Sequence, residues 1–295
     1  MPMKILIVDE KNSNKKIIDF LQNQYNNLST STIYKALRKK DIRINNIRIN
    51  ENCLVRLGDE IKIYIPDDLL ENIKKIPIVY QDDNIVVFNK PNNMETTGEN
   101  SLTSIAKEMF KNNSNTYVEP CHRLDRNTSG IILFSRNKKS EEILLNAFKN
   151  HTIKKRYICV VTGIPKDDSK RLEAYLFKDS KKSLVYISDI PKAGYKKIIT
   201  NYTILKKNYE KNLALLDISI ETGRTHQIRA HLAYIGYPIL GDGKYGKNKV
   251  NSQFKTNKQC LASYSVQLTE LQGTELSYLN NKNIQLDTLP FSNLV

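Results

Sequence analysis

Residues 122–130 (HRLDRNTSG) hold one carboxylate, Asp125, between the guanidiniums of Arg123 and Arg126. Two flanking cations favour the ionised form of a carboxylate even where the site is partly removed from water. Asp125 can therefore serve as a nucleophile or a base. The alternative is a surface turn with a local ion pair, which contributes little energy. The residue types alone leave both interpretations open.

A second polar segment, residues 222–232 (TGRTHQIRAHL), follows the apolar run 213–220 about a hundred residues later. This order predicts a strand, a tight turn at Gly223 and a helix that begins near Thr225. The free N–H groups and the positive end of such a helix face whatever lies in front of it. Arg224 stands at that position.

The two segments resemble the marker motifs of the RluA-type family of RNA pseudouridine synthases, and the resemblance extends over most of the chain after about residue 78. It implies that uridine within RNA is isomerised to pseudouridine, without a cofactor. The target base must leave its stack to be reached. Asp125 is then the essential group, which attacks the ribose or the ring, or abstracts a ribose proton.

The resemblance also implies roles for residues around Asp125. Arg224 would pair with Asp125 and orient it. Tyr157, in the family-like pattern of residues 156–163 (RYICVVTG), would stack on the flipped ring and assist removal of the proton on carbon five. Arg123 resembles the residue that fills the space left by the flipped base. The other substrate-binding candidates in the two motifs are His122, Arg126, Thr225, His226, Gln227 and Arg229.

The charge balance points to a polyanionic partner. The 295 residues include 46 Lys and Arg against 31 Asp and Glu, for a formal net charge of +15. Such an excess is typical of proteins that bind nucleic acid, although a Lys-rich solvated surface gives the same balance. Together with the motifs, it predicts structured RNA, either ribosomal RNA or tRNA, as the partner of a protein that we expect to be monomeric.

Cysteine and histidine placement argues against metal and disulfide chemistry. The four cysteines are widely spaced without a C-x-x-C pair, which favours reduced thiols and a cytoplasmic protein. His226 and His231 are five residues apart, unlike the i, i+4 pair of zinc enzymes, so we expect no metal. No apolar run reaches the ~18 residues that a membrane span requires, and the first residues lack a signal sequence. Residues 241–246 (GDGKYG) lack the spacing of a phosphate-binding P-loop and predict a structural turn.

Residues 13–65 look like an independent module. Apolar spacing predicts a first helix, Ser31 is a candidate N-cap for a second, residues 42–49 predict a hairpin around Asn45 and Asn46, and residues 54–65 predict a further strand pair. This ααββ pattern resembles the small RNA-binding domain named after ribosomal protein S-four. The segment carries ten Lys and Arg against five Asp and Glu. The candidate phosphate contacts, whose alternative is a solvated basic face, are Lys35, Arg38, Lys39, Lys40, Arg43 and Arg48.

Residues 66–77 predict a linker, and residues 78–295 a catalytic domain. Many short apolar runs and few long helices indicate an α+β fold, and the resemblance implies a mixed, mostly antiparallel sheet with flanking helices. Residues 85–88 predict a buried strand that leads to Lys90, which would either contact RNA or be solvated. Ser140 is a candidate cap for the helix after the strand 131–134.

Two other functions fit parts of the sequence. A noncatalytic RNA-binding or ribosome-assembly protein could keep the fold, but nothing at the four key positions supports the loss of activity. A glycoside hydrolase built on Asp125 and Glu221 needs two placed carboxylates and explains neither the Arg and Tyr residues nor the basic module. A nucleophile formed by Cys121 and His122 is disfavoured because adjacent residues of an extended segment point in opposite directions.

Overall fold

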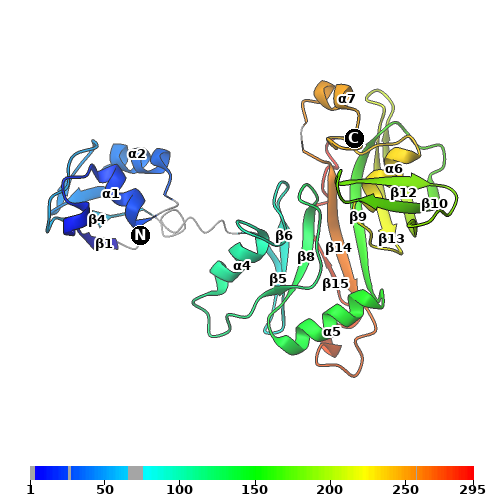
Figure 1. Ribbon diagram of the computed structural model, residues 1–295, viewed down its shortest axis with the longest axis horizontal. Helices are drawn as coiled ribbons and strands as arrows, with labels where there is room; N and C mark the ends of the chain where they lie inside the picture. Colours follow the sequence, from blue (N-terminus) through cyan, green and yellow to red (C-terminus); the bar gives the residue numbers. More distant parts are fainter. Residues whose placement is uncertain (1–3, 26–27, 66–75, 257) are drawn as a thin grey trace. The chain divides into compact units, whose positions relative to one another are not determined.

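The computed structural model describes residues 4–25, 28–65, 76–256 and 258–295. The chain forms two compact units, residues 1–75 and 76–295 (Figure 1). The linker predicted at residues 66–77 lies, up to residue 75, outside the described residues.

The small unit packs two helices on a four-stranded sheet of order β1-β4-β2-β3. Two of its features differ from the sequence prediction. A strand precedes residue 13, since β1 pairs with β4, and residues 54–65 contain one named strand rather than two. The elements are β1 (Lys4–Ile7), the short 3-10 helix η1 (Glu10–Asn12), α1 (Ile17–Gln24), α2 (Thr30–Lys39), β2 (Ile42–Ile44), β3 (Ile47–Arg48) and β4 (Glu60–Ile63).

Local chemistry sets the boundaries of these elements. Ser29, not Ser31, caps α2, because its hydroxyl accepts the backbone N–H of Thr32. Asn45 and Asn46 both have positive φ, as a two-residue hairpin between β2 and β3 requires. The apolar faces of α1 and α2 then close over the β4 side chains, so the small unit has a core of its own.

The described residues of the large unit form one eleven-stranded sheet. Nine strands follow the order β11-β10-β12-β13-β9-β14-β8-β6-β5, and the other two are β15, which pairs with β14, and β7, which pairs with β8. Within the described residues, every strand pairing of this sheet is antiparallel except that between β14 and β8, which confirms the expected mixed, mostly antiparallel sheet of an α+β fold. The strands are β5 (Ile78–Gln81), β6 (Ile85–Lys90), β7 (Glu119–Pro120), β8 (Ser129–Ser135), β9 (Ile153–Thr162), β10 (Ser169–Asp179), β11 (Leu184–Ser188), β12 (Lys196–Asn208), β13 (Leu213–Ile220), β14 (Leu261–Leu268) and β15 (Asn283–Gln285).

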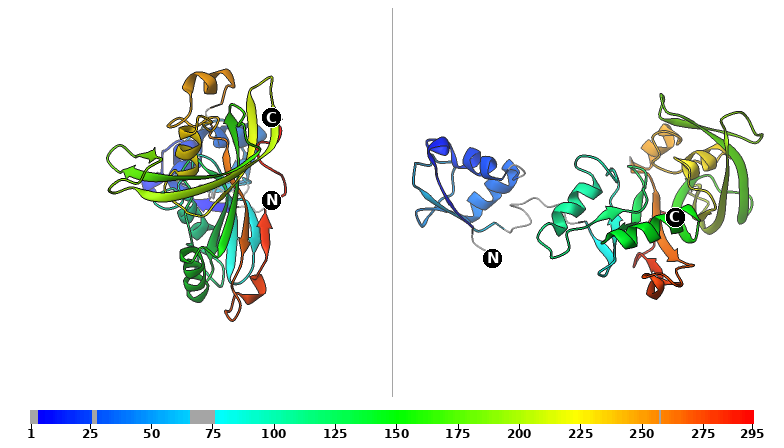
Figure 2. Two further views of the ribbon diagram at one scale, coloured as in Figure 1. Left: turned by 90° about the vertical axis from the view of Figure 1, so that its right-hand side faces the viewer. Right: turned by 60° about the horizontal axis from the view of Figure 1, so that its bottom comes forward.

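Short helices flank this sheet. Asn137, three residues before the predicted Ser140, caps α5 by accepting the backbone N–H of Ser140. Figure 2 (left) shows the β10–β13 strands running across those of β6, β8 and β14, so the sheet is strongly twisted. The helices are α4 (Leu102–Phe110), α5 (Lys138–Lys149), α6 (Gln227–Tyr234), α7 (Asn248–Gln253) and the 3-10 helix η2 (Ser277–Leu279).

The parallel pairing of β8 with β14 depends on a glycine. Gly130 has φ +104°, and a Cβ there would lie 2.0 Å from the carbonyl oxygen of Ser263. Only a residue without a side chain allows the two backbones to approach this closely. Because Gly130 follows the 122–129 segment directly, this contact fixes where the Asp125 loop leaves the sheet.

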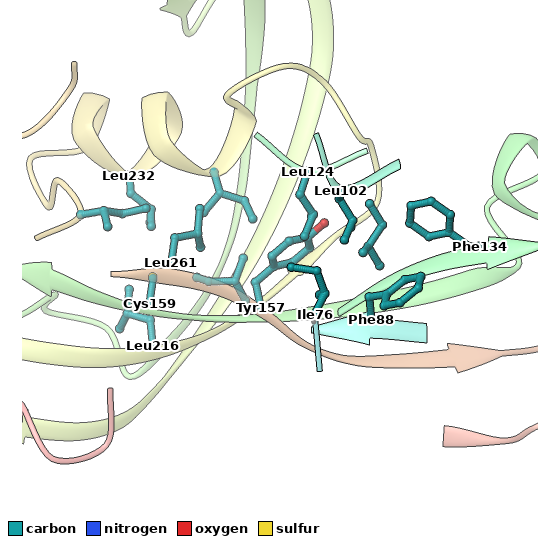
Figure 3. Close-up of a cluster of buried hydrophobic side chains, with 14 of the residues drawn as sticks. Ile76, Phe88, Leu102, Leu124, Phe134, Tyr157, Cys159, Leu216, Leu232 and Leu261 are labelled. Atoms are coloured by element: carbon teal, nitrogen blue, oxygen red, sulfur yellow. The ribbon is translucent and has the colours of Figure 1, made fainter. Parts of the chain in front are cut away.

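One side of the central strands carries the largest apolar cluster, which includes residues of β6, β8, β9, β13 and α6. Figure 3 shows Tyr157 in the middle of this cluster, between Leu261 on one side and Phe88 on the other. The floor of the candidate site is therefore rigid core.

Candidate active site

The buried ammonium group of Lys90 anchors the Asp125 loop to the turn after β6. The Lys90 side chain is fully buried, and its Nζ donates to the carbonyl oxygens of Met94 at 2.7 Å and of Pro91 and Arg126 at 3.1 Å each. Burial lowers the pKa of Lys90 to about 8, so the ammonium is charged at neutral pH. Lys90 is thus neither solvated nor free to contact RNA. It ties the turn after β6 to the residue that follows Asp125.

The helix behind Asp125 begins later than predicted. His226 has φ +53° and lies just before α6, whose first residue is Gln227 rather than Thr225. The Gln227 amide is buried: its oxygen accepts from the backbone N–H of Arg224 and the Thr222 hydroxyl, and its nitrogen donates to Ile199 and Thr200. Because both ends of the amide are engaged, Gln227 shapes the turn before α6, and its contact with substrate stays a prediction.

Arg229, and not Arg224, pairs with Asp125. The Arg229 Nη1 lies 3.1 Å from Asp125 Oδ2, while its Nε and Nη2 donate to Asp242 at 2.7 and 3.1 Å. Arg229 is buried, because α6 is enclosed from Gln227 to Leu232. Arg224 precedes the helix and is exposed. The later helix start turns the second arginine of the motif, instead of the first, toward the Asp125 loop.

Electrostatics keep Arg229 and Asp242 ionised. Burial by itself lowers the pKa of Arg229, but its bonds to Asp242 and Asp125 outweigh burial, so the pKa is raised. Burial acts to raise the pKa of Asp242, yet hydrogen bonds from Arg229 and from the backbone bring it below its usual value. Two carboxylates sharing one guanidinium leave the group with one net negative charge.

The histidines just before α6 and within it, His226 and His231, are neutral. Burial lowers the pKa of His226, against the opposing effect of Asp125, whose Oδ2 lies 3.9 Å from its Nε2. The other ring nitrogen of His226 is 2.9 Å from the Tyr245 hydroxyl. His231 is buried beside Thr200, and burial lowers its pKa to about 4. His226 thus borders the site as an uncharged group.

Tyr157 and Asp125 line the same small pocket of about 90 Å³, which we call the catalytic pocket. Burial, followed by the charge of Asp125, raises the pKa of Tyr157, so its hydroxyl is protonated at neutral pH. Among the described residues that line the catalytic pocket, Asp125 is the only carboxylate. The full lining is Arg123, Leu124, Asp125, Thr128, Lys155, Tyr157, Ile220, Gly223, Arg224, His226, Gln227, Ile228, Arg229 and Leu261.

The catalytic pocket shares residues with two larger hollows. The first, which we call the β9 groove, has a volume of about 960 Å³ and is lined by His151, Lys154, Arg156 and residues 219–224 among others. The second lies beside the hairpin of β10 and β11, and we call it the hairpin groove. Its volume is about 560 Å³, and its lining includes Lys178, Ser180 and Lys244. Arg123 lines all three hollows, whereas Arg126 and Thr225 line the hairpin groove. Exposed Arg123 thus stands where they meet.

His122 has a structural contact and also lines the β9 groove, so its role in substrate binding stays a prediction. Its Nε2 accepts the backbone N–H of Leu133, and its ring packs against Phe148 with centroids 4.6 Å apart. Burial lowers the pKa of His122 well below its usual value. The neighbouring Cys121 is no nucleophile either, since burial raises the pKa of its thiol to about 12.

The described residues offer neither the carboxylate pair of a glycoside hydrolase nor a cluster of metal ligands. Glu221 is exposed, bonded to Arg171 and Asn201, and lines the β9 groove rather than the catalytic pocket, so it does not form a carboxylate pair with Asp125. In the described part of the chain, no three His, Cys, Asp or Glu side chains gather closely enough to hold a metal ion. Nor is any helix of the described residues long and apolar enough to cross a membrane.

The six basic candidates of the small unit differ in their surroundings. Five of them are exposed, whereas Arg43 is partly buried, with its guanidinium 4.8 Å from the centre of the Tyr64 ring. The exposed residues lie on α2, at its end and on β3: Lys35, Arg38, Lys39, Lys40 and Arg48.

Comparison with known proteins agrees with this geometry. The family model of RNA pseudouridylate synthases matches residues 84–234, which include Asp125, Tyr157 and Arg229. The ribosomal large subunit pseudouridine synthase C of Buchnera aphidicola from Acyrthosiphon pisum is 31% identical over 87% of this chain and 85% of its own. An uncharacterised RNA pseudouridine synthase of Mycoplasma capricolum is 32% identical over 96% of this chain and 97% of its own.

A solved structure shows the same fold. Human RNA pseudouridylate synthase domain containing 1 superposes with a TM-score of 0.60 at 20% identity, covering 74% of this chain and 84% of that one. The chain therefore belongs to the RNA pseudouridine synthase family. It is an isomerase that converts uridine in RNA to pseudouridine.

Proposed function

We propose that this enzyme modifies uridines of large-subunit ribosomal RNA, and that it does so with Asp125 in the catalytic pocket. The observation that carries the role of Asp125 is its ion pair with buried Arg229 in a pocket where, among the described lining residues, no other carboxylate is found. The choice of RNA is supported by relatives named ribosomal large subunit pseudouridine synthase C, which are 31 and 33% identical. We expect the protein to act in the cytoplasm as a monomer.

The reaction needs few groups. The bond from ribose C1′ to N1 of the ring breaks and one to C5 forms, while C5 loses a proton and N1 gains one. Asp125, held by its contact with Arg229, acts on the flipped uridine, and the Tyr157 ring stacks on the base. Arg123 enters the space that the base leaves. The flanking RNA passes into the β9 groove, where Lys154 and Arg156 offer positive charge.

The hydroxyl of Tyr157 is proposed to take part in the removal of the C5 proton. We expect Tyr157→Phe to lower the single-turnover rate by about 100-fold while RNA affinity stays unchanged, since the stacking face is retained. Tyr157→Leu removes the face as well and should weaken binding too. Tritium release from RNA labelled at C5 measures the rate. A Phe variant as fast as the wild type would restrict Tyr157 to stacking.

The exposed basic residues of α2 are proposed to contact RNA phosphates. Replacing Lys35, Arg38 and Lys39 by Ala in the full chain should reduce the slope of log affinity against log salt by roughly 2 to 3. The control removes the same charge from exposed positions of the large unit, at Lys247, Lys249 and Lys258. Equal slopes in the two triple variants would mean that α2 does not touch RNA.

Pseudouridine mapping of total RNA from cells with and without this chain identifies the target. We expect signals in large-subunit ribosomal RNA that vanish with the gene and return with the wild type but not with Asp125→Asn. Signals that vanish from tRNA instead would replace the proposed target while leaving the reaction intact.

A further inference from the structure

We propose that Asp242 is a positioning residue of the reaction, which acts on Asp125 through Arg229. The inference rests on the proposed catalytic function of Asp125. Asp242 is not among the residues that line the catalytic pocket or either groove. Its side chain is fully buried and is bonded to two nitrogens of Arg229.

The two bonds fix the plane of the guanidinium. A bidentate contact between carboxylate and arginine holds both groups in one plane, so the direction of the third nitrogen is fixed as well. That nitrogen, Nη1, meets Asp125 Oδ2 at 3.1 Å. Without Asp242, the Arg229 side chain would be free to turn toward whichever acceptor is nearest. The contact with Asp125 is therefore set by a residue that does not touch the substrate.

The turn around Asp242 is itself closely held. Its Oδ1 accepts the backbone N–H groups of Lys244 at 2.8 Å and Tyr245 at 3.1 Å. Gly241 has φ +77°, and a Cβ there would lie 2.0 Å from the Lys258 carbonyl oxygen. The Asn251 side chain accepts the Gly241 N–H and donates to the Asp242 carbonyl. The turn thus leaves the Asp242 carboxylate little freedom to move.

Charge gives Asp242 a second effect on the same pair. Arg229 carries one positive charge and is shared by two carboxylates, so it does not neutralise Asp125 fully. Asp242 binds two nitrogens of Arg229 and Asp125 binds one, so Asp242 takes the larger share of that charge. Asp125 then keeps excess negative charge that can act on the uridine. If Arg229 were bonded to Asp125 alone, that charge would be neutralised more fully.

The test measures single-turnover rates and RNA affinity of full-length variants on the RNA identified by mapping. Asp242→Asn retains the size of the side chain but loses one acceptor and the charge. We expect the rate at saturating RNA to fall by about 100-fold, as for a reacting group displaced by roughly 1 Å, with affinity within about threefold of the wild type. Asp242→Glu keeps the charge and should lose about tenfold, which is a partial rescue.

The control variant is Asp217→Asn. Asp217 is also buried, at 7% exposure, and is bonded to two nitrogens of an arginine, Arg156, but it does not contact Asp125. It should show a similar loss of melting temperature and a wild-type rate at saturating RNA; because Arg156 lines the β9 groove, a loss in Asp217→Asn should be confined to affinity. An Asp242→Asn rate within threefold of the wild type, an equal rate loss in both Asn variants, or a loss in Asp242→Asn confined to affinity would each overturn the proposal. Should Asp242→Asn not fold, a wild-type rate in Asp242→Glu overturns it.

A crystal structure of the Asp242 variants gives a result that does not depend on turnover. We expect Arg229 Nη1 to leave Asp125 Oδ2, and an unchanged contact at 3.1 Å overturns the inference. If Asp125→Asn converts uridine as fast as the wild type while the contact is broken in the Asp242 variant, the proposed catalytic function of Asp125 fails and the positioning by Asp242 stands.

Discussion

Asp125→Asn is expected to reduce pseudouridine formation by roughly 10⁴-fold or more, to background, while fold and RNA affinity stay close to those of the wild type. Asn has the shape of Asp and can still accept a hydrogen bond from Arg229, but it has no charge with which to act as nucleophile or base. The side chain is 24% exposed, so its replacement opens no cavity in the core. Carbodiimide mapping of RNA treated with the variant gives the yield.

The same samples supply the control for that prediction. Thermal unfolding and RNA binding of Asp125→Asn should match the wild type within about 1 kcal/mol. Turnover near the wild-type level would remove Asp125 from the chemistry and return it to the role of a surface turn. A large loss of RNA affinity would instead mean that the Asn side chain disturbs the loop.

Arg229→Met is expected to have the second-largest effect, and it separates the two arginines of the motif. The substitution leaves buried Asp242 without its cation, which costs about 3 to 5 kcal/mol of unfolding free energy. It also frees Asp125 from its partner, and we expect the rate to fall by about two to three orders of magnitude. Arg224→Ala, at an exposed position, should change the rate at saturating RNA by less than about tenfold.

The pH dependence of stability gives an independent check on Arg229. In the wild type the pKa of Asp242 is lowered, so its contribution to stability is present above the unfolded pKa and is lost as the pH falls through the folded one. In Arg229→Met the buried carboxyl has no cation, and its pKa should rise. The stability difference between the two proteins should therefore be largest at neutral pH and narrow toward pH 4. A stability difference that stays constant with pH, or a larger loss of rate in Arg224→Ala than in Arg229→Met, would contradict the pairing of Arg229 with Asp125.

The sequence by itself determined the chemistry and its approximate place. The charges around Asp125, the Arg-rich segment after an apolar strand and the pattern around Tyr157 are local, and local patterns survive without knowledge of the fold. They predicted the family, the α+β class and seven of the residues that line the catalytic pocket: Arg123, Asp125, Tyr157, Arg224, His226, Gln227 and Arg229. The hairpin at Asn45 and Asn46 was equally local, because these residues tolerate positive φ.

Tertiary structure alone decided which cation serves Asp125. Arg224 lies just before α6 and Arg229 lies in its first turn. Each residue along a helix rotates the side-chain direction by about 100°, so which arginine faces Asp125 depends on where the helix starts and on what surrounds it. Neither the left-handed His226 nor the burial of α6 from Gln227 to Leu232 is visible in its sequence. The same holds for Lys90, which looked like a surface cation until three carbonyl groups from two loops enclosed it. Burial and ion pairing are long-range properties, because they depend on segments that lie far apart in the chain: Asp242 meets Asp125 only through Arg229, 104 residues after it.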